Sequence, residues 1–293
     1  MKDFCFKVDE NKCIHCGLCE KDCICNVISL NENKIPVALD GKNCINCQHC
    51  MTICPVGAIS VNGKTPENSD KIYSQNPDMI LNLIKSRRSD RNFKNENLDN
   101  ERMQKLKDML KYVPTGCNCH GLHFSFIDDV NVMNDFRDYV NEKVVTALTK
   151  KPIKAVAEKF SPFAKGLING EDVIFRGAPH MVVVSNSIKA SCAAQDPIIA
   201  LSYFELYAQS LGVGTCWCGL AEGAMKIFPE LCDYMGVPEG YQLGYAMLFG
   251  AKEVNYQRTI QPQEAEIVSA KKKTIDKIGF CQKIKRFFWN FIR

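Results

Sequence analysis

The first 65 residues consist of short apolar stretches separated by polar residues. Alternation of apolar and polar residues at 4–8 is typical of a β-strand with one buried face. Two apolar stretches at 27–30 and 35–39 enclose a polar turn and predict a β-hairpin. A further strand is expected at 58–61, just before an Asn-Gly turn. A unit this small buries little apolar surface, so we expect something besides an apolar core to hold it together.

From residue 78 onward the pattern is that of longer helices and buried strands. The expected helices cover 79–85, 103–112, most of 131–169 with breaks at Pro152 and Pro162, and 198–212. The expected strands cover 124–127, 181–184 and 245–250, and the last two are uninterrupted apolar runs typical of strands buried on both faces. The pattern divides the chain into a small domain at 1–65, a polar linker at 66–77, a larger domain at 78–262 and a tail at 263–293.

Composition narrows the class of protein. Hydrophobic residues make up 46% of the 293 residues, which permits a sizeable core, and a net charge of +4 gives no reason to expect nucleic acid as a partner. The N-terminus has no apolar signal region and no apolar run reaches about 18 residues, so we expect a cytoplasmic protein. With 17 cysteines, the chain is expected in a reducing compartment of an anaerobic cell.

Cysteines gather in two runs with the same spacing. Residues 13–23 carry the pattern C-x2-C-x2-C-x3-C, and residues 44–54 repeat it 31 positions later, followed by Pro55. Thiolates are the ligands that iron–sulfur clusters prefer. The spacing is typical of bacterial ferredoxins with two [4Fe–4S] clusters, in which the fourth Cys of each run binds the cluster of the other run.

This rule assigns eight ligands to two clusters. One cluster is expected to bind Cys13, Cys16, Cys19 and Cys54, and the other is expected to bind Cys44, Cys47, Cys50 and Cys23. Cys25 lies close enough to Cys23 to compete for its role. The alternative is a pair of zinc sites, but zinc motifs combine two Cys pairs rather than two triplets that each have a trailing Cys.

A basic segment at 87–91 is the first candidate site of the larger domain. It contains three arginines and a serine within five residues. The planar guanidinium group suits two-point binding of phosphate. By itself the segment also fits a solvated basic surface, so its interpretation depends on the segments that follow it.

Five segments, in order, resemble the nitroreductase family of FMN enzymes over about residues 78–260. They are Arg87-x-Ser89-x-Arg91-x-Phe93, Pro114 to Asn118, Gly177-Ala178-Pro179, Leu211 to Gly219, and Gly244-Tyr245. The resemblance implies an α+β domain in which helices flank a central, mainly antiparallel sheet. It also implies a homodimer with FMN in each of two sites at the subunit interface.

The resemblance also implies a set of FMN contacts. The phosphate, ribityl chain and pyrimidine edge are expected to contact Arg87, Arg88, Ser89 and Arg91, with Arg91 near flavin N1, where a cation stabilises the reduced anion. The loop that reaches the partner subunit's FMN is expected to contain Pro114, Thr115, Gly116 and Asn118. The turn passing flavin N5 corresponds to Cys216, Trp217, Cys218 and Gly219, and a further phosphate contact corresponds to Arg258. No catalytic side chain is expected, because flavin N5 performs the chemistry.

The chain departs from the family pattern after Asn118. Many members continue with Gln-Pro-Trp-His, whereas residues 119–123 here read Cys-His-Gly-Leu-His, so the substrate cannot be taken from better-known relatives. A further metal site formed by Cys117, Cys119, Cys216, Cys218 and His120 is one interpretation. The other is that these thiols fill space in the core. Gly212-x-Gly214 follows a helix rather than a strand, so it does not predict a Rossmann NAD site.

The tail combines basic and apolar residues at 271–293. We favour a helix that packs on the partner subunit or on the small domain. The alternative is a basic amphipathic helix lying on an anionic membrane surface.

Together the two parts predict an FMN-dependent oxidoreductase. Two [4Fe–4S] clusters pass electrons to FMN, which reduces a small oxidised acceptor such as a nitroaromatic, a quinone or an activated alkene. The donor is expected to be a low-potential protein, a ferredoxin or flavodoxin, or else NAD(P)H. Two alternatives remain open: a redox sensor or electron relay that is not an enzyme, and a flavin reductase that uses FMN as its substrate.

Overall fold

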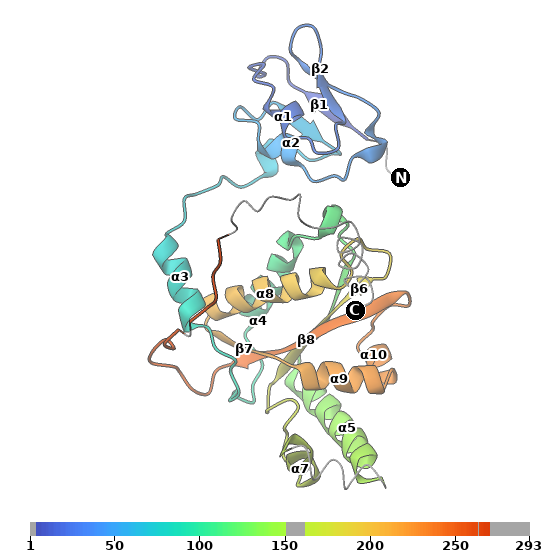
Figure 1. The fold of residues 1–293 in the computed structure, drawn as a ribbon, viewed down its shortest axis with the longest axis vertical. Coiled ribbons are helices and arrows are strands. Elements are labelled where there is room, and N and C mark those ends of the chain that lie inside the picture. Colours follow the sequence, from blue (N-terminus) through green and yellow to red (C-terminus); the bar gives the residue numbers. More distant parts are fainter. Residues whose placement is uncertain (1–3, 151–161, 263, 270–293) are drawn as a thin grey trace, which may run out of the picture. The chain divides into compact units, whose positions relative to one another are not determined.

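The computed structural model describes residues 4–150, 162–262 and 264–269. Residues 1–259 form one compact unit and residues 260–293 a second. Within the described part of the chain, no helix is both long enough and apolar enough to cross a membrane. The first unit contains a small cysteine-rich domain followed by a larger α+β domain (Figure 1).

The cysteine-rich domain consists of two antiparallel strand pairs and two short helices. β1 (Phe6–Val8) pairs with β4 (Ile59–Val61), and β2 (Ile28–Leu30) pairs with β3 (Pro36–Ala38). These pairings confirm the predicted strands and hairpin. The short helices are α1 (Leu18–Lys21) and α2 (His49–Thr52), each placed within one cysteine run, and the 3-10 turns are η1 (Gly41–Asn43) and η2 (Pro66–Asn68).

The sequence repeat is also a repeat of backbone conformation. Gly17 and Gln48 precede α1 and α2, and both adopt the left-handed conformation, with φ of 71° and 62°. Residues at equivalent places in the two runs therefore turn the chain in the same way. This conformation is uncommon for a residue with a side chain, and Gln48 adopts it where the other run has glycine.

A four-stranded antiparallel sheet forms the centre of the larger domain. Its strand order is β5-β6-β8-β7, built from β5 (Leu122–Ile127), β6 (His180–Ser187), β8 (Tyr241–Ala251) and β7 (Val213–Trp217). Every neighbouring pair is antiparallel. The predicted α+β class with a mainly antiparallel sheet is confirmed.

Helices cover both faces of this sheet (Figure 1). The helices of this domain are α3 (Pro77–Ser86), α4 (Asn100–Met109), α5 (Val130–Thr149), α7 (Pro162–Ile168), α8 (Gln195–Ser210), α9 (Gly219–Ile227) and α10 (Glu230–Tyr234), with 3-10 turns η3 (Leu110–Tyr112) and η4 (Gly116–Asn118). α4 and α8 pack on one face of the sheet, and α5 and α9 pack on the other. The helices α3, α4 and α5 begin with the capping residues Asn76, Asp99 and Asp129. Their side chains accept hydrogen bonds from backbone N–H groups of the first helical turn, which have no partner within the helix.

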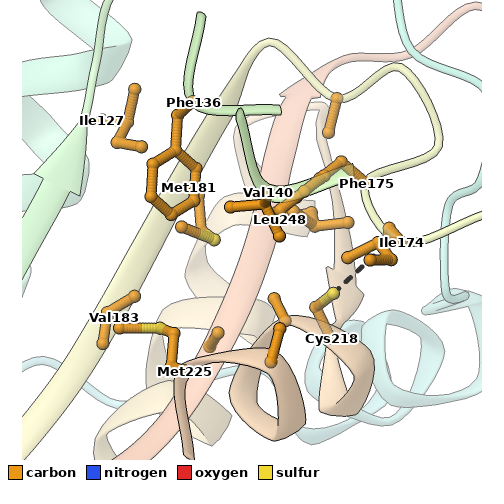
Figure 2. Packing of buried hydrophobic residues seen from close by; sticks show 14 of the residues in the cluster. Ile127, Phe136, Val140, Ile174, Phe175, Met181, Val183, Cys218, Met225 and Leu248 are labelled. Atoms are coloured by element: carbon orange, nitrogen blue, oxygen red, sulfur yellow. Dashed lines mark hydrogen bonds between the residues drawn. The ribbon is translucent and has the colours of Figure 1, made fainter. Parts of the chain in front are cut away.

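The alternation of side chains along β6 creates two cores. Met181 and Val183 point to one face, where they pack with residues such as Phe136 of α5 and Met225 of α9 (Figure 2). Val182 and Val184 point to the other face, where they pack against α4 and α8. Because all four valine and methionine side chains are fully buried, β6 confirms the prediction of a strand buried on both faces.

Several expectations concern residues at or beyond the edges of these elements. Pro162 is the first residue of α7, as expected for a break between helices. Residues 151–161, with Pro152, and the basic segment 271–293 lie outside the described residues. The predicted linker contains η2 at its start and ends where α3 begins.

Candidate functional site

Two cavities in the small domain are lined by the predicted cluster ligands. One cavity is lined by Cys13, Cys16, Cys19 and Cys54, together with apolar residues. The other is lined by Cys23, Cys25, Cys44, Cys47 and Cys50. The fold therefore brings each predicted set of four thiols to one cavity, with the trailing Cys of each run crossing to the other run. Ligation itself stays a prediction.

Burial in the cavity walls disfavours free thiolates. Burial raises the pKa of the Cys50 thiol to about 11 and raises the pKa of Cys19 and Cys44 as well. A thiolate in these surroundings needs a cation to offset its loss of hydration, and iron supplies one. The backbone N–H of Ala58 also donates to Cys54 Sγ at 3.2 Å, a type of contact that tunes cluster potential.

Other metal arrangements receive no support from the described residues. Among them, no three His, Cys, Asp or Glu side chains converge on a point where a single metal ion would bind. A cubic cluster does not require such convergence, because each thiolate binds a different iron atom. Of the five residues in the alternative metal site, Cys117 and Cys119 are exposed and Cys216 and Cys218 are buried.

Asp90 fixes the basic segment to the sheet of the larger domain. Its carboxylate, which is 1% exposed, accepts hydrogen bonds from Gln209 Nε2 at 2.9 Å and from the Thr215 backbone N–H at 3.2 Å. The Asp90 N–H donates to the Thr215 carbonyl at 2.8 Å. In an extended segment alternate side chains point in opposite directions. Burying Asp90 therefore leaves Ser89 and Arg91 facing the other way.

A pocket of about 300 Å³ lies on that other side. Six of the thirteen predicted FMN contacts line it, namely Ser89, Arg91, Cys216, Trp217, Cys218 and Gly219. Its lining among the described residues includes two arginines, Arg91 and Arg176, and no carboxylate. α9 begins at Gly219, and Gly219 and Leu220 line the pocket, so the positive end of the helix dipole lies at the pocket. The electrostatics of the pocket favour an anionic ligand.

The turn at 216–219 is held by its neighbours. The Cys218 N–H donates to the Ala246 carbonyl at 2.9 Å. The rings of Trp217 and Tyr245 pack edge to face with their centroids 5.4 Å apart. A Cβ atom added to Gly219 would lie 2.7 Å from the Tyr245 hydroxyl, so a larger residue there would require the Tyr245 side chain to shift. Burial raises the pKa of Cys218 to about 12 and also raises that of Cys216, so both thiols remain protonated at neutral pH.

The remaining predicted contacts lie outside this pocket. They are Arg87, Arg88, Pro114, Thr115, Gly116, Asn118 and Arg258. Arg87 forms an ion pair with Glu205 at 2.9 Å, and Glu205 is 8% exposed. Arg88 donates through Nη1 to the Lys85 carbonyl, whereas its Nη2 is buried without a hydrogen-bond partner. Such an unpaired guanidinium nitrogen fits a phosphate ligand. Arg258 is exposed in the segment after β8.

The 114–118 loop is anchored away from the pocket. The Gly116 N–H donates to the buried Asp196 carboxylate at 2.9 Å. The Asn118 side-chain amide donates to the carbonyls of Ile45 at 2.9 Å and Asn46 at 3.2 Å, which lie between two predicted cluster ligands. Within one chain, this loop therefore does not join the pocket residues. Its contact with FMN of a partner subunit stays a prediction.

Two residues of the site were missed by the sequence analysis. Asp90 is an isolated acid within a basic segment, and that contrast was the available signal for a buried anchor. Arg176 directly precedes the Gly177-Ala178-Pro179 motif, yet nothing in its local spacing connects it with Arg91.

Comparisons with known proteins agree with this architecture. A family model described as the nitroreductase family matches residues 84–251, more than half of the chain. The chain belongs to the nitroreductase family. A second model, described as a 4Fe-4S dicluster domain, matches residues 12–58 of this nitroreductase-family protein. No curated protein sequence matches the chain significantly.

Solved structures show the same fold for the nitroreductase domain. A nitroreductase with bound FMN from Desulfitobacterium hafniense DCB-2 is 23% identical, and the match covers 68% of this chain and all of that chain with a TM-score of 0.54. A nitroreductase with bound FMN from Bacteroides fragilis is 24% identical over 67% of this chain and all of its own, with a TM-score of 0.51. At these identities, the likeness establishes the fold alone.

Proposed function

We propose that this protein is an FMN-dependent oxidoreductase in which two [4Fe–4S] clusters pass electrons to FMN, which reduces a small oxidised acceptor. The observation that carries the proposal is the pocket that gathers Ser89, Arg91 and the 216–219 turn at the N-terminus of α9. Bound FMN would supply the exchange between single electrons and electron pairs. The solved relatives that contain FMN have the same fold, and their cofactor supports the assignment.

The residues of the pocket fit parts of FMN. Arg91 and the α9 N-terminus supply positive charge for a reduced, anionic ring system. Arg88 lies outside the pocket lining, and its free Nη2 would donate to a phosphate oxygen, which removes an unsatisfied buried donor. Asp90 acts indirectly, since its buried hydrogen bonds determine where Ser89 and Arg91 point.

Electron supply from the clusters is supported by the fusion of both parts in one chain and by the Asn118 contacts. Asn118 belongs to the loop predicted to reach FMN, and it binds the carbonyls of Ile45 and Asn46 between Cys44 and Cys47. We therefore propose that the cluster bound by Cys44, Cys47, Cys50 and Cys23 is the one that delivers electrons to FMN. The donor to the clusters would be a reduced ferredoxin or flavodoxin, or NAD(P)H would reduce FMN directly.

We further propose a homodimer in the cytoplasm of an anaerobic cell. α3 exposes Met79, Ile80, Leu81 and Ile84 although it packs beside α8, which itself exposes Ile198 and Tyr203. Apolar side chains gathered on neighbouring helices support a second copy as the partner.

An anaerobic titration tests the function. Purified protein is reduced with reduced ferredoxin or with NAD(P)H, the reduction is followed by visible absorbance and EPR, and a nitroaromatic is then added. We expect about eight irons per chain, bound FMN, and flavin bleaching that reverses with the acceptor. Arg91→Gln should weaken FMN retention, whereas the matched Arg102→Gln on α4 should not. Reduction without reoxidation by any small acceptor would indicate a relay or sensor, and absence of FMN would contradict the proposal.

A further inference from the structure

Arg176 sits in a turn that is fixed by one carboxylate. Asp172 accepts hydrogen bonds from the backbone N–H groups of Phe175 at 2.9 Å and Gly177 at 2.8 Å, the two residues that flank Arg176. The same carboxylate pairs with Arg137 of α5, with Nε at 3.0 Å. The turn is therefore tied at both sides of Arg176 and attached to a long helix, which leaves its backbone little freedom.

The backbone of Arg176 adopts a conformation that residues with side chains rarely use. Its φ is 54°, in the left-handed region. Such a conformation persists where the surrounding contacts determine it, and it often occurs at binding sites. A further hydrogen bond restrains this turn. Cys218 Sγ donates to the Ile174 carbonyl at 3.3 Å, and so attaches the turn to Cys218 in the pocket lining (Figure 2).

The result of this arrangement is a second guanidinium group in the flavin pocket. Arg176 and Arg91 both line it, and both act to lower the pKa of Cys216 against the larger effect of burial, so they flank the same thiol. Among the residues that the structure describes, no carboxylate forms an ion pair with Arg176 and no acceptor forms a hydrogen bond with its side chain. Arg137, in the same region, is paired with Asp172. Arg176 therefore has donors available for a ligand.

We propose that Arg176 binds the carboxylate of the acceptor, so that this site selects small anionic acceptors over neutral ones of the same shape. The inference rests on the proposed function for the identity of the pocket. Arg91 and the α9 N-terminus already supply positive charge for the flavin ring, and Arg88 has a free donor for phosphate. The guanidinium of Arg176 is partly buried and is not required for these FMN contacts. Such a group suits a planar carboxylate, which it binds through two parallel hydrogen bonds.

Binding is tested first with a pair of probes that cannot be reduced by the enzyme. Calorimetric titration of the full-length protein with benzoate and with benzamide compares a carboxylate with a neutral group of equal size. For Arg176→Gln we expect benzoate affinity to fall by about 10- to 100-fold, the loss typical of a charged hydrogen-bonded contact. Benzamide affinity should stay within about twofold, since the amide does not need the charge. Arg176→Lys should restore part of the benzoate affinity, and Arg102→Gln should leave both unchanged.

Turnover then separates this inference from the proposed function. With 4-nitrobenzoate and 4-nitrobenzamide as acceptors, Arg176→Gln should raise KM for the first about as much as it weakens benzoate, with little change for the second. FMN content and flavin midpoint potential should match the wild type. If the wild-type protein reduces neither acceptor but benzoate binding still depends on Arg176, the inference stands and the proposed acceptor reduction fails. Equal losses for both probes, a changed flavin potential, or unchanged benzoate affinity in Arg176→Gln would each overturn the inference.

Discussion

The cysteine-rich domain and the nitroreductase domain differ in what fills their centres. The small domain buries one small apolar cluster, formed by Cys19, Met51, Ile59 and Val61, and a few further apolar residues, Val27, Ile28 and Ala58. Its predicted iron ligands, Cys19 among them, line two cavities. The nitroreductase domain buries one extensive apolar cluster on each face of its sheet, and its pocket lies at the margin of one of them. In the first domain the predicted iron–sulfur clusters would take the place of an extensive core. In the second, apolar side chains alone form the core.

This difference determines how each domain depends on its ligand. When a site does not exist in the unfolded chain, the free energy of metal binding becomes free energy of folding. The proposed flavin pocket is instead formed by elements that the two apolar clusters already hold, namely β7, the start of α9 and the segment fixed by Asp90. Loss of iron should therefore affect structure, whereas loss of FMN should affect mainly activity.

Iron removal tests the comparison with the largest expected effect. Anaerobic chelation should unfold residues 6–61, because the small apolar cluster cannot hold the domain alone. Hydrogen exchange should show complete loss of amide protection in β1–β4 and unchanged protection in β6 and β8. Protection that persists in the small domain after complete iron loss would show that its apolar cluster suffices.

The crossed ligand assignment gives the next effect. Cys54→Ser should remove the cluster expected on Cys13, Cys16 and Cys19, and iron content should fall from about eight to about four per chain. Alkylation followed by mass spectrometry should then label those three thiols while Cys44 stays protected. Cys23→Ser should give the opposite labelling, and the exposed Cys5→Ser serves as the control. Labelling of Cys44 in Cys54→Ser would contradict the crossing.

A substitution in the apolar core of the nitroreductase domain tests whether that domain depends on its own packing. Phe136 is 1% exposed and packs against Phe175 and Tyr234. Phe136→Ala should lower the free energy of unfolding of the nitroreductase domain by about 3–5 kcal/mol, through lost burial and the cavity left behind. Urea denaturation followed by Trp fluorescence measures it. Ile59→Ala, which is buried in the other domain, should leave that transition in place; a shift there would mean that the domains unfold together.

The smallest expected effect is a pH dependence confined to the larger domain. Burial lowers the pKa of His180 to about 4, and its Nε2 accepts the Leu98 N–H at 3.0 Å. Because the pKa of His180 in the folded protein lies below the usual value near 6.5, folding favours the neutral imidazole over the protonated one. Stability is then full above about pH 6.5 and falls as the pH drops toward 4, by about 3 kcal/mol.

Urea midpoints of the full chain between pH 7 and pH 4.5 measure this loss. His180→Asn keeps an acceptor for Leu98 without titrating in this range, so its midpoint should depend less on pH. An unchanged pH dependence in that variant would assign the loss to other groups.

Much of the fold followed from local patterns. The uninterrupted apolar run along β6 predicted its burial on both faces, because a strand places successive side chains on opposite sides whatever surrounds it. The two cysteine runs predicted which thiols share a cavity, since the spacing of each triplet restricts the chain locally and the repeat pairs the runs. Cys25 could not be placed from spacing, and the fold puts it at the cavity of Cys23.

The pocket was predictable only in part. Ser89, Arg91 and residues 216–219 carry a recognisable pattern, and the fold brings them together. Arg87 belongs to the same motif as Ser89 and Arg91, but in the fold it forms an ion pair with Glu205 of α8, which is distant in the sequence. A motif shows which residues are present. It does not show which of the arginines forms an ion pair with a carboxylate from a distant part of the sequence.

The sequence by itself indicated the family, the two-domain order and the grouping of the cysteines, because each depends on short motifs and on the order in which they follow one another along the chain. Only the tertiary structure decided that Asp90 is the buried anchor of the basic segment and that Arg176 shares a pocket with Arg91. Those placements depend on how β7, α8 and the 172–177 turn pack. Packing between distant segments determines which charges are paired and which remain available for a ligand.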